Sequence, residues 1–225
     1  MEALVNKFYC WIHGKTCAPQ EKGEPSAGVW HSRVRAEVID LCRWQNGKLL
    51  EVGCGEGLFM ANLTAVNPQL KICGIDNNID KLQKAKKKFE NNELKKAEFL
   101  YADALNLPVK NNCFDCVVCI NTFFNIGSIG TVSRILQQIV RVCKNKGRII
   151  FDFRNSLNPF LRIKYKLAPY YDQTVKECNL PLNTYSPEDI DDILKKLNLT
   201  ILKKSYIGFP LKFLAPVIVV EAKKC

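Results

Sequence analysis

The sequence predicts an α/β fold built on a doubly wound, mostly parallel sheet, and three observations carry this prediction. Apolar runs of strand length alternate along the chain with longer segments of helical periodicity. The run at 49–52 stops abruptly at glycines separated by single residues, which is typical of a buried strand that turns sharply into a helix. The next apolar run ends in an acid, Asp76, about twenty residues further on, as in sheets of this class.

Length and composition limit the class of protein. A chain of 225 residues is long enough to bury a full core, and we expect a single domain over 1–225. Eleven cysteines would indicate disulfides in a small secreted protein, but no apolar signal segment opens the chain. We therefore expect reduced thiols and a cytoplasmic location. The formal net charge of +11 favours non-specific attraction to nucleic acid or to an anionic membrane.

One cysteine cluster has the spacing of a metal site. Cys113, Cys116 and Cys119 follow the C-x-x-C-x-x-C pattern of an iron–sulfur ligand run. They lie in a predicted strand, where alternation sends Cys116 and Cys119 to opposite faces. Thiols arranged in this way cannot converge on one metal, so we expect them to pack as small apolar residues. Cys10 and Cys17 lack a second pair, and no metal site is expected there.

The elements on either side of the glycines follow from periodicity. Glycines and prolines between 16 and 28 break any regular element, and helical spacing begins at Val29. The strands expected after the glycines are 71–76, 98–101, 114–120 and 148–153. The helices expected between them are Glu56 to about Val66, one with the buried stripe Ile79, Leu82, Ala85 and Phe89, and one built on Val132, Ile135, Leu136, Ile139 and Cys143.

The last third of the chain begins with the least regular region, 155–185, which is rich in aromatic and basic residues. A long insertion of this kind is more often functional than random. Ser186 then has the features of a helix cap, with proline at the next position and acids in the first turn. Two strands, 200–208 and 216–222, are expected to follow, and the run within the second is much too short to span a bilayer.

The stretch from Glu51 to Gly57, Glu-Val-Gly-Cys-Gly-Glu-Gly, is the centre of the predicted site. Its glycines allow positive φ values and let a ligand approach the backbone closely. The spacing differs from the G-x-G-x-x-G of dinucleotide-binding turns, and Glu51 stands two residues before the first glycine. That carboxylate would repel a pyrophosphate, whereas it would attract the ammonium of an amino-acid moiety beside a sulfonium.

These motifs, in this order, resemble class I S-adenosylmethionine-dependent methyltransferases from Gly47 to about Asp152. The resemblance implies that S-adenosylmethionine is the cofactor, that S-adenosylhomocysteine is the product, and that the last strand of a seven-stranded sheet is antiparallel. It places the methionine part of the cofactor on the glycine turn and adenine on Asp103 and Ala104. The offset of Asp76 predicts ribose binding, and the alternative is that Asp76 only caps the next helix. The residues expected to bind the cofactor are Glu51, Gly53, Cys54, Gly55, Gly57, Asp76, Asn77, Asp103, Ala104, Asn121 and Thr122.

The acceptor side of the predicted site is less defined. In the family the N-terminal segment, here 1–45, often folds over the cofactor, so Trp30, His31 and Arg35 are candidates for lining the site. The insertion at 155–185 corresponds to the family's acceptor lid. If the acceptor is a hydroxyl, the candidates for a base or an orienting group are Asp152, His31, Tyr170 and Tyr171, with Asp152 best placed at a strand end. Packing roles are the alternative for each.

The leading hypothesis is an enzyme that moves a methyl group to a nucleophilic O, N or C atom of a small molecule by direct displacement. RNA methylation is an alternative, motivated by the net charge and by basic residues interleaved with aromatics after Arg154. The segment 121–125 lacks the Pro-Pro-aromatic run of nucleic-acid amino methyltransferases, which argues against that subgroup. A third hypothesis is a non-catalytic, cofactor-binding regulatory subunit. The acceptor and the oligomeric state stay open.

Overall fold

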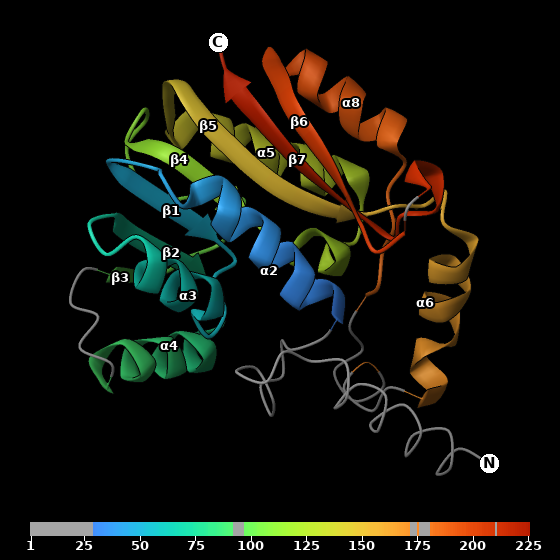
Figure 1. The fold of residues 1–225 in the computed structure, drawn as a ribbon, viewed down its shortest axis with the longest axis horizontal. Helices are drawn as coiled ribbons and strands as arrows, with labels where there is room; N and C mark the ends of the chain where they lie inside the picture. The colour runs from blue at the N-terminus through green and yellow to red at the C-terminus, as the bar shows by residue number, and fades with distance from the viewer. Residues whose placement is uncertain (1–28, 92–96, 172–174, 176–180, 210) are drawn as a thin grey trace.

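A seven-stranded sheet with helices on both faces forms the body of the protein in the computed structural model (Figure 1). The structure describes residues 29–91, 97–171, 175, 181–209 and 211–225. The strands are β1 Lys48–Val52, β2 Lys71–Asp76, β3 Ala97–Tyr101, β4 Phe114–Cys119, β5 Cys143–Arg154, β6 Leu199–Ile207 and β7 Val217–Lys224. The helices are α2 Val29–Cys42, α3 Leu58–Val66, α4 Ile79–Asn91, α5 Ile129–Val142, α6 Pro159–Tyr171 and α8 Pro187–Lys196, with short 3₁₀ turns η2 Phe123–Asn125 and η3 Lys212–Leu214.

The strand order β3-β2-β1-β4-β5-β7-β6 reverses direction at β1. β1 pairs in parallel with β2 on one side and with β4 on the other, and β7 runs antiparallel to β5 and β6. The doubly wound sheet with an antiparallel last strand is therefore confirmed. Because ligands of such sheets bind outside the carboxyl ends of the strands where the order reverses, the ends of β1 and β4 locate the site.

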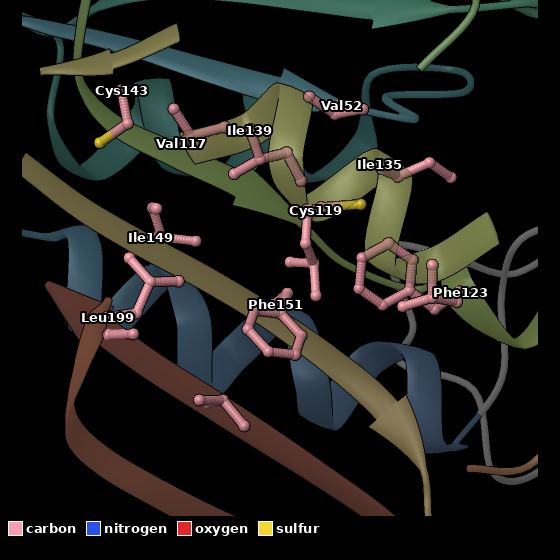
Figure 2. Close-up of a cluster of buried hydrophobic side chains, with 14 of the residues drawn as sticks. Val52, Val117, Cys119, Phe123, Ile135, Ile139, Cys143, Ile149, Phe151 and Leu199 are labelled. Carbon is pink, nitrogen blue, oxygen red and sulfur yellow. The ribbon is translucent and has the colours of Figure 1, made fainter. Parts of the chain in front are cut away.

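Two apolar layers hold the sheet between its helices. One layer packs α2, α3 and α4 against the sheet, and the other packs α5 and α8 against the opposite face. Figure 2 shows the second layer, in which Val117 and Cys119 of β4 lie near Ile135 and Ile139 of α5. Cys116 belongs to the first layer, so the predicted alternation of Cys116 and Cys119 is confirmed.

The helix α5 ends one residue before the sequence pattern suggests. Cys143 fits the helical stripe of α5, but its backbone is extended (φ −72°, ψ 136°) and it is the first residue of β5. A buried position fits both the helical and the strand period here, so apolar spacing alone cannot place the boundary. β5 consequently starts at Cys143 instead of Arg148 and continues to Arg154.

Three further expectations are corrected. α3 begins at Leu58 because Gly57 lies in the left-handed region (φ 72°), where a helix cannot continue. Ile79 is 50% exposed at the start of α4, so the buried stripe of that helix begins at Leu82. The stretch 155–185 is less irregular than expected, because it contains the helix α6 with Pro169 in its last turn. Among the described residues, no helix combines the length and the apolar composition that a membrane crossing requires.

Candidate active site

A cavity of about 550 Å³ lies at the carboxyl ends of β1 to β4. Every predicted cofactor-binding residue except Gly57 lines its wall. Four segments supply them: the glycine turn after β1, Asp76 and Asn77 after β2, Asp103 and Ala104 after β3, and residues 121–122 after β4. The parallel strands therefore bring together, at one edge of the sheet, residues that are far apart in the sequence.

Glu51 is the most unusual group in this wall. Its side chain is only 3% exposed, and its Oε2 has no hydrogen-bond partner among the described residues. Burial raises the pKa of Glu51 well above its usual range; the positive charge of Arg35 opposes this rise, and the nearby carboxylate of Asp76 adds to it. A buried acceptor without a partner is unfavourable by itself. The arrangement therefore fits a cationic group in the cavity beside Glu51.

The glycine turn supplies bare backbone next to this carboxylate. Gly55 has a φ of 52°, and a Cβ built there would find no atom closer than the Cδ of Lys81 at 4.0 Å. A Cβ on Gly53 would instead lie 2.4 Å from the Oγ1 of Thr122. Gly53 is thus required for packing against the segment after β4, whereas Gly55 keeps the space above its backbone open.

Asp76 joins the turn to the end of β2. Its Oδ2 accepts a hydrogen bond from the Gly55 amide (2.8 Å), and its Oδ1 accepts one from the Asn78 amide (2.9 Å). The helix α4 is capped by Asn78, whose Oδ1 accepts from the Lys81 amide (3.0 Å). The capping alternative for Asp76 is therefore wrong. Each carboxylate oxygen has two lone pairs, so Asp76 retains capacity for hydroxyl donors in the cavity.

The end of β4 forms the opposite wall. Asn121 has a φ of 53°, and its amide donates to the Oδ1 of Asp152 (2.5 Å). Its side-chain Nδ2 donates to the carbonyl of His31 (3.4 Å). Asn125, at the end of η2, also lines the cavity, and its Oδ1 is buried without a hydrogen-bond partner in the described part of the chain. This wall therefore offers one amide oxygen to a ligand.

Asp152 lies behind this wall instead of on it. It is 1% exposed and forms an ion pair with Arg154, also 1% exposed, at 2.5 Å between Oδ2 and Nη1. Burial raises the pKa of Asp152, and the Arg154 charge opposes that rise. Arg154 also donates to the Tyr165 hydroxyl (3.3 Å) and to the Oδ1 of Asn121 (3.1 Å). The strand continues past Asp152 to Arg154, so the acid is part of a closed network and lacks a position on the cavity wall.

Two other candidates for a base, His31 and Tyr170, also lie off the cavity wall. His31 packs edge-on against Phe124, with ring centroids 5.4 Å apart, and Tyr170 is 69% exposed on α6. The side chain of Tyr171 lies outside the described residues. Of the N-terminal candidates, Arg35 lines the cavity, whereas the Trp30 ring packs against the backbone of Gly208.

The sequence analysis missed several residues of the wall, among them Asn125 and Lys81. Asn125 lies in the segment 121–125, which follows the fourth predicted strand. The sequence therefore indicated that Asn125 lies near the site, but gave it no role. Lys81 is one of several lysines on the helix predicted after Asp76, and lysines on such a helix are usually solvated. Its position in the first turn of α4, which follows the acid at the end of β2, is the signal that would have distinguished it. Among the described residues no cluster of His, Cys, Asp or Glu could hold a metal ion, and Cys10 and Cys17 lie outside them.

Comparison with known proteins agrees with this geometry. A family model described as a methyltransferase domain matches residues 45–202. The chain belongs to this family. The resemblance to class I S-adenosylmethionine-dependent methyltransferases is thereby confirmed, and S-adenosylmethionine is the cofactor of this domain.

The similar proteins differ in the share of each chain over which they match. Demethylmenaquinone methyltransferases of Bacillus cereus and Bacillus anthracis are 31% identical over 122 residues, 53% of this chain and 50% of theirs. The chain thus spans about half the length of the curated relatives it matches. A protein of Pyrococcus horikoshii has the same fold with a TM-score of 0.68 at 20% identity, over 88% of this chain and 92% of that one. Magnesium protoporphyrin IX methyltransferase of Synechocystis, solved with bound S-adenosylhomocysteine, gives 0.68 at 16% identity, over 88% and 84%.

Proposed function

We propose that this chain transfers the methyl group of S-adenosylmethionine to an oxygen, nitrogen or carbon nucleophile of a small molecule by direct displacement. The observation that carries the proposal is the buried Glu51 at the cavity wall beside the open backbone of Gly55, with an oxygen that no described residue hydrogen-bonds. A carboxylate in this position matches the ammonium of the methionine moiety and would repel a phosphate.

The remaining donor-side residues have matching chemistry. Asp76 can accept hydrogen bonds from two ribose hydroxyls while it keeps its bonds to the Gly55 and Asn78 amides. Asp103 lies at the end of β3, where it can accept from the adenine amino group beside Ala104. The bound cofactor supplies a methyl carbon activated by a sulfonium. The residues of this chain bind it, orient it and keep water from it.

On the acceptor side, the residues after β4 that line the cavity are neutral. Asn125 presents an amide oxygen without a partner in the described part of the chain, which supports an acceptor that carries a hydroxyl or amine donor. Asp152 is held by Arg154 and Asn121, so its contribution is to fix the backbone of the wall. The chain therefore contributes alignment more than strong base catalysis. The curated relatives are named for a small molecule, and this favours a small-molecule acceptor over RNA.

The test combines binding with transfer. The purified chain should bind S-adenosylmethionine and S-adenosylhomocysteine in calorimetric titrations, and Asp76→Ala should weaken binding by about 1.5–3 kcal/mol, the usual loss for charge-assisted hydrogen bonds. Asp80→Ala, on the exposed start of α4, is the matched control and should change little. Transfer of a labelled methyl group is then measured on a panel of hydroxyl, amine and quinol compounds and on RNA. Absence of cofactor binding would overturn the proposal, and binding without transfer to any acceptor would favour a regulatory subunit.

A further inference from the structure

The helix α6 has a second apolar face that points away from the protein. Its inner face is buried through Leu161 and Ala168. The outer side chains recur at helical spacing and are largely exposed: Phe160 69%, Ile163 58%, Leu167 48% and Tyr170 69%. Residues three and four apart share one side of a helix, so these four form a continuous stripe, which we name the outer α6 face. A stripe of this kind is unusual on a solvated helix and indicates a binding surface.

Basic residues border this stripe on both edges. Lys164 lies one turn after Phe160, and Lys166 lies one turn before Tyr170, so the two lysines flank the stripe on opposite sides. Arg162 lies further round the helix, and α6 contains no acidic residue. Long lysine stems can lie along an apolar surface while their ammonium groups reach a polar layer above it. An apolar stripe with basic edges is the pattern of a helix that lies in the plane of a membrane interface.

Apolar side chains of a neighbouring loop are also exposed. Phe209, Leu211 and Phe213 are 47%, 51% and 58% exposed. The residues that lead into α6 hold this loop: Asn155 Nδ2 donates to the Phe213 carbonyl (3.2 Å), and Asn158 Nδ2 donates to the Leu214 carbonyl. In Figure 1, α6 stands at the periphery of the molecule, with η3 close to its first turn. The backbone of residues 213–214 therefore lies beside the start of α6.

We propose that the outer α6 face, together with the exposed side chains of Leu211 and Phe213, docks this protein on the surface of an anionic lipid bilayer, with α6 lying in the interface. The helix has 13 residues, too few to span a bilayer, but a length suited to lying on one. The charge of the lysines beside the stripe distinguishes a lipid bilayer from a second copy of the chain as the partner. A second copy of the chain would bring lysine edges against lysine edges, and such like-charge contacts disfavour pairing. Anionic headgroups complement both edges, and the acyl boundary accepts the apolar stripe.

The test is flotation of the full chain with vesicles of phosphatidylcholine alone or with added phosphatidylglycerol. The chain should float with the anionic vesicles, less so at high salt, and hardly with the neutral ones. Replacement of two stripe residues, Phe160→Ser with Ile163→Ser, should lower the partition coefficient about tenfold or more. Leu202→Ser, which removes a 50% exposed apolar side chain from β6, is the matched control and should leave it unchanged.

The lysines are tested in the same way. Lys164→Gln with Lys166→Gln should lower binding to anionic vesicles about fivefold per lysine and leave the weak binding to neutral vesicles unaltered. Lys86→Gln with Lys87→Gln, two exposed lysines of α4, is the control with the same change of charge.

Four results would overturn the proposal. The first is that the chain fails to float with anionic vesicles. The second is that the control variants lose as much binding as the α6 variants. The third is that the stripe variant lowers the molecular mass in light scattering, because the face would then hold a second copy. The fourth is that this variant lowers the melting temperature in circular dichroism, since the face would then be covered by the chain itself.

Discussion

The two sides of the cavity differ in how their polar groups are used. On the donor side, at the ends of β1 to β3, one oxygen of Glu51 has no hydrogen-bond partner among the described residues, and the space above the Gly55 backbone is open. On the acceptor side, behind the ends of β4 and β5, Asp152, Arg154 and Asn121 bond to one another. Buried polar groups are normally paired, so an unpaired one marks where a ligand is received. The donor side is thus built to receive a charged group, whereas the network behind the acceptor side is built to stay fixed.

This difference separates residues that bind from residues that position. A variant on the donor side should change ligand affinity with little change in stability. A variant in the network behind the acceptor wall should do the reverse, because it disturbs groups that contact only the protein.

The largest effect, a loss of stability, is expected from Arg154→Met. It leaves Asp152 buried and without its charge partner, and removal of one member of a buried ion pair lowers the free energy of unfolding by about 3–5 kcal/mol. The loss is measured by urea unfolding. Burial already raises the pKa of Asp152, and loss of Arg154 raises it further. A carboxyl whose pKa is raised in the folded state opposes folding once the pH rises above its ordinary value, about 3.9, so the destabilisation should be greater at pH 7 than at pH 4.

Two controls define this result. Arg162→Met removes an exposed charge from α6 and should change stability by less than about 0.5 kcal/mol. Arg154→Met combined with Asp152→Asn removes both charges and should recover part of the loss. If Arg154→Met unfolds at the same urea concentration as the unmodified protein, the network has no positioning role.

The second prediction concerns the open backbone of the donor side. Gly55→Val should weaken S-adenosylmethionine binding by about a hundredfold or more, because the new side chain would occupy space that the cofactor needs. A valine at a φ of 52° also lowers stability by about 1–2 kcal/mol, so the protein should stay folded. Calorimetry and circular dichroism are compared with Gly127→Val, where a Cβ meets no atom within 4 Å and no positive φ is required. Loss of structure together with binding would show that the turn is mainly structural.

The donor side could be predicted from sequence because its residues follow their strands directly. Asp76 ends one apolar run at the expected offset from the glycines, and Asp103 follows the next run at the position that the family resemblance implies. Parallel strands then bring these ends to one edge of the sheet without further information. The predicted cofactor residues consequently line the cavity, apart from Gly57, which faces Ala85 and Phe89.

The acceptor side could not be predicted in the same way because its contacts are distant in sequence. Asp152 was expected at a strand end, but the strand continues to Arg154, which lies on the same face two residues later and pairs with it. Tyr165, which completes the network, comes from α6. That helix was not predicted from the sequence, which has a proline at position 169. A proline usually signals an interruption, yet here it lies in the last turn of the helix.

A smaller effect on cofactor binding is expected from Glu51→Gln, which keeps the shape of the side chain and removes its charge. Cofactor affinity should fall about ten- to a hundredfold, the loss of a charge-assisted hydrogen bond. The unmodified protein should also show a pH dependence. Its Glu51 has a raised pKa, so binding of an ammonium requires release of a proton below that pKa, and affinity should increase as the pH rises through it. Glu51→Gln should bind equally weakly at every pH. A persistent pH dependence in the variant would assign the titration to another group.

The smallest effect is expected from Tyr170→Ala. Tyr170 is exposed on the outer α6 face and does not line the cavity, so cofactor affinity should stay within about threefold, under ~0.7 kcal/mol. Methyl transfer to a water-soluble acceptor should also be preserved, in contrast to the acceptor role expected from the sequence, because a side chain on the far face of α6 cannot contact a molecule in the cavity. Transfer rates with saturating cofactor measure this directly. A tenfold fall in kcat with a soluble acceptor would mean that α6 turns its outer face toward the cavity during the reaction, and the division between donor and acceptor sides would then have to include that movement.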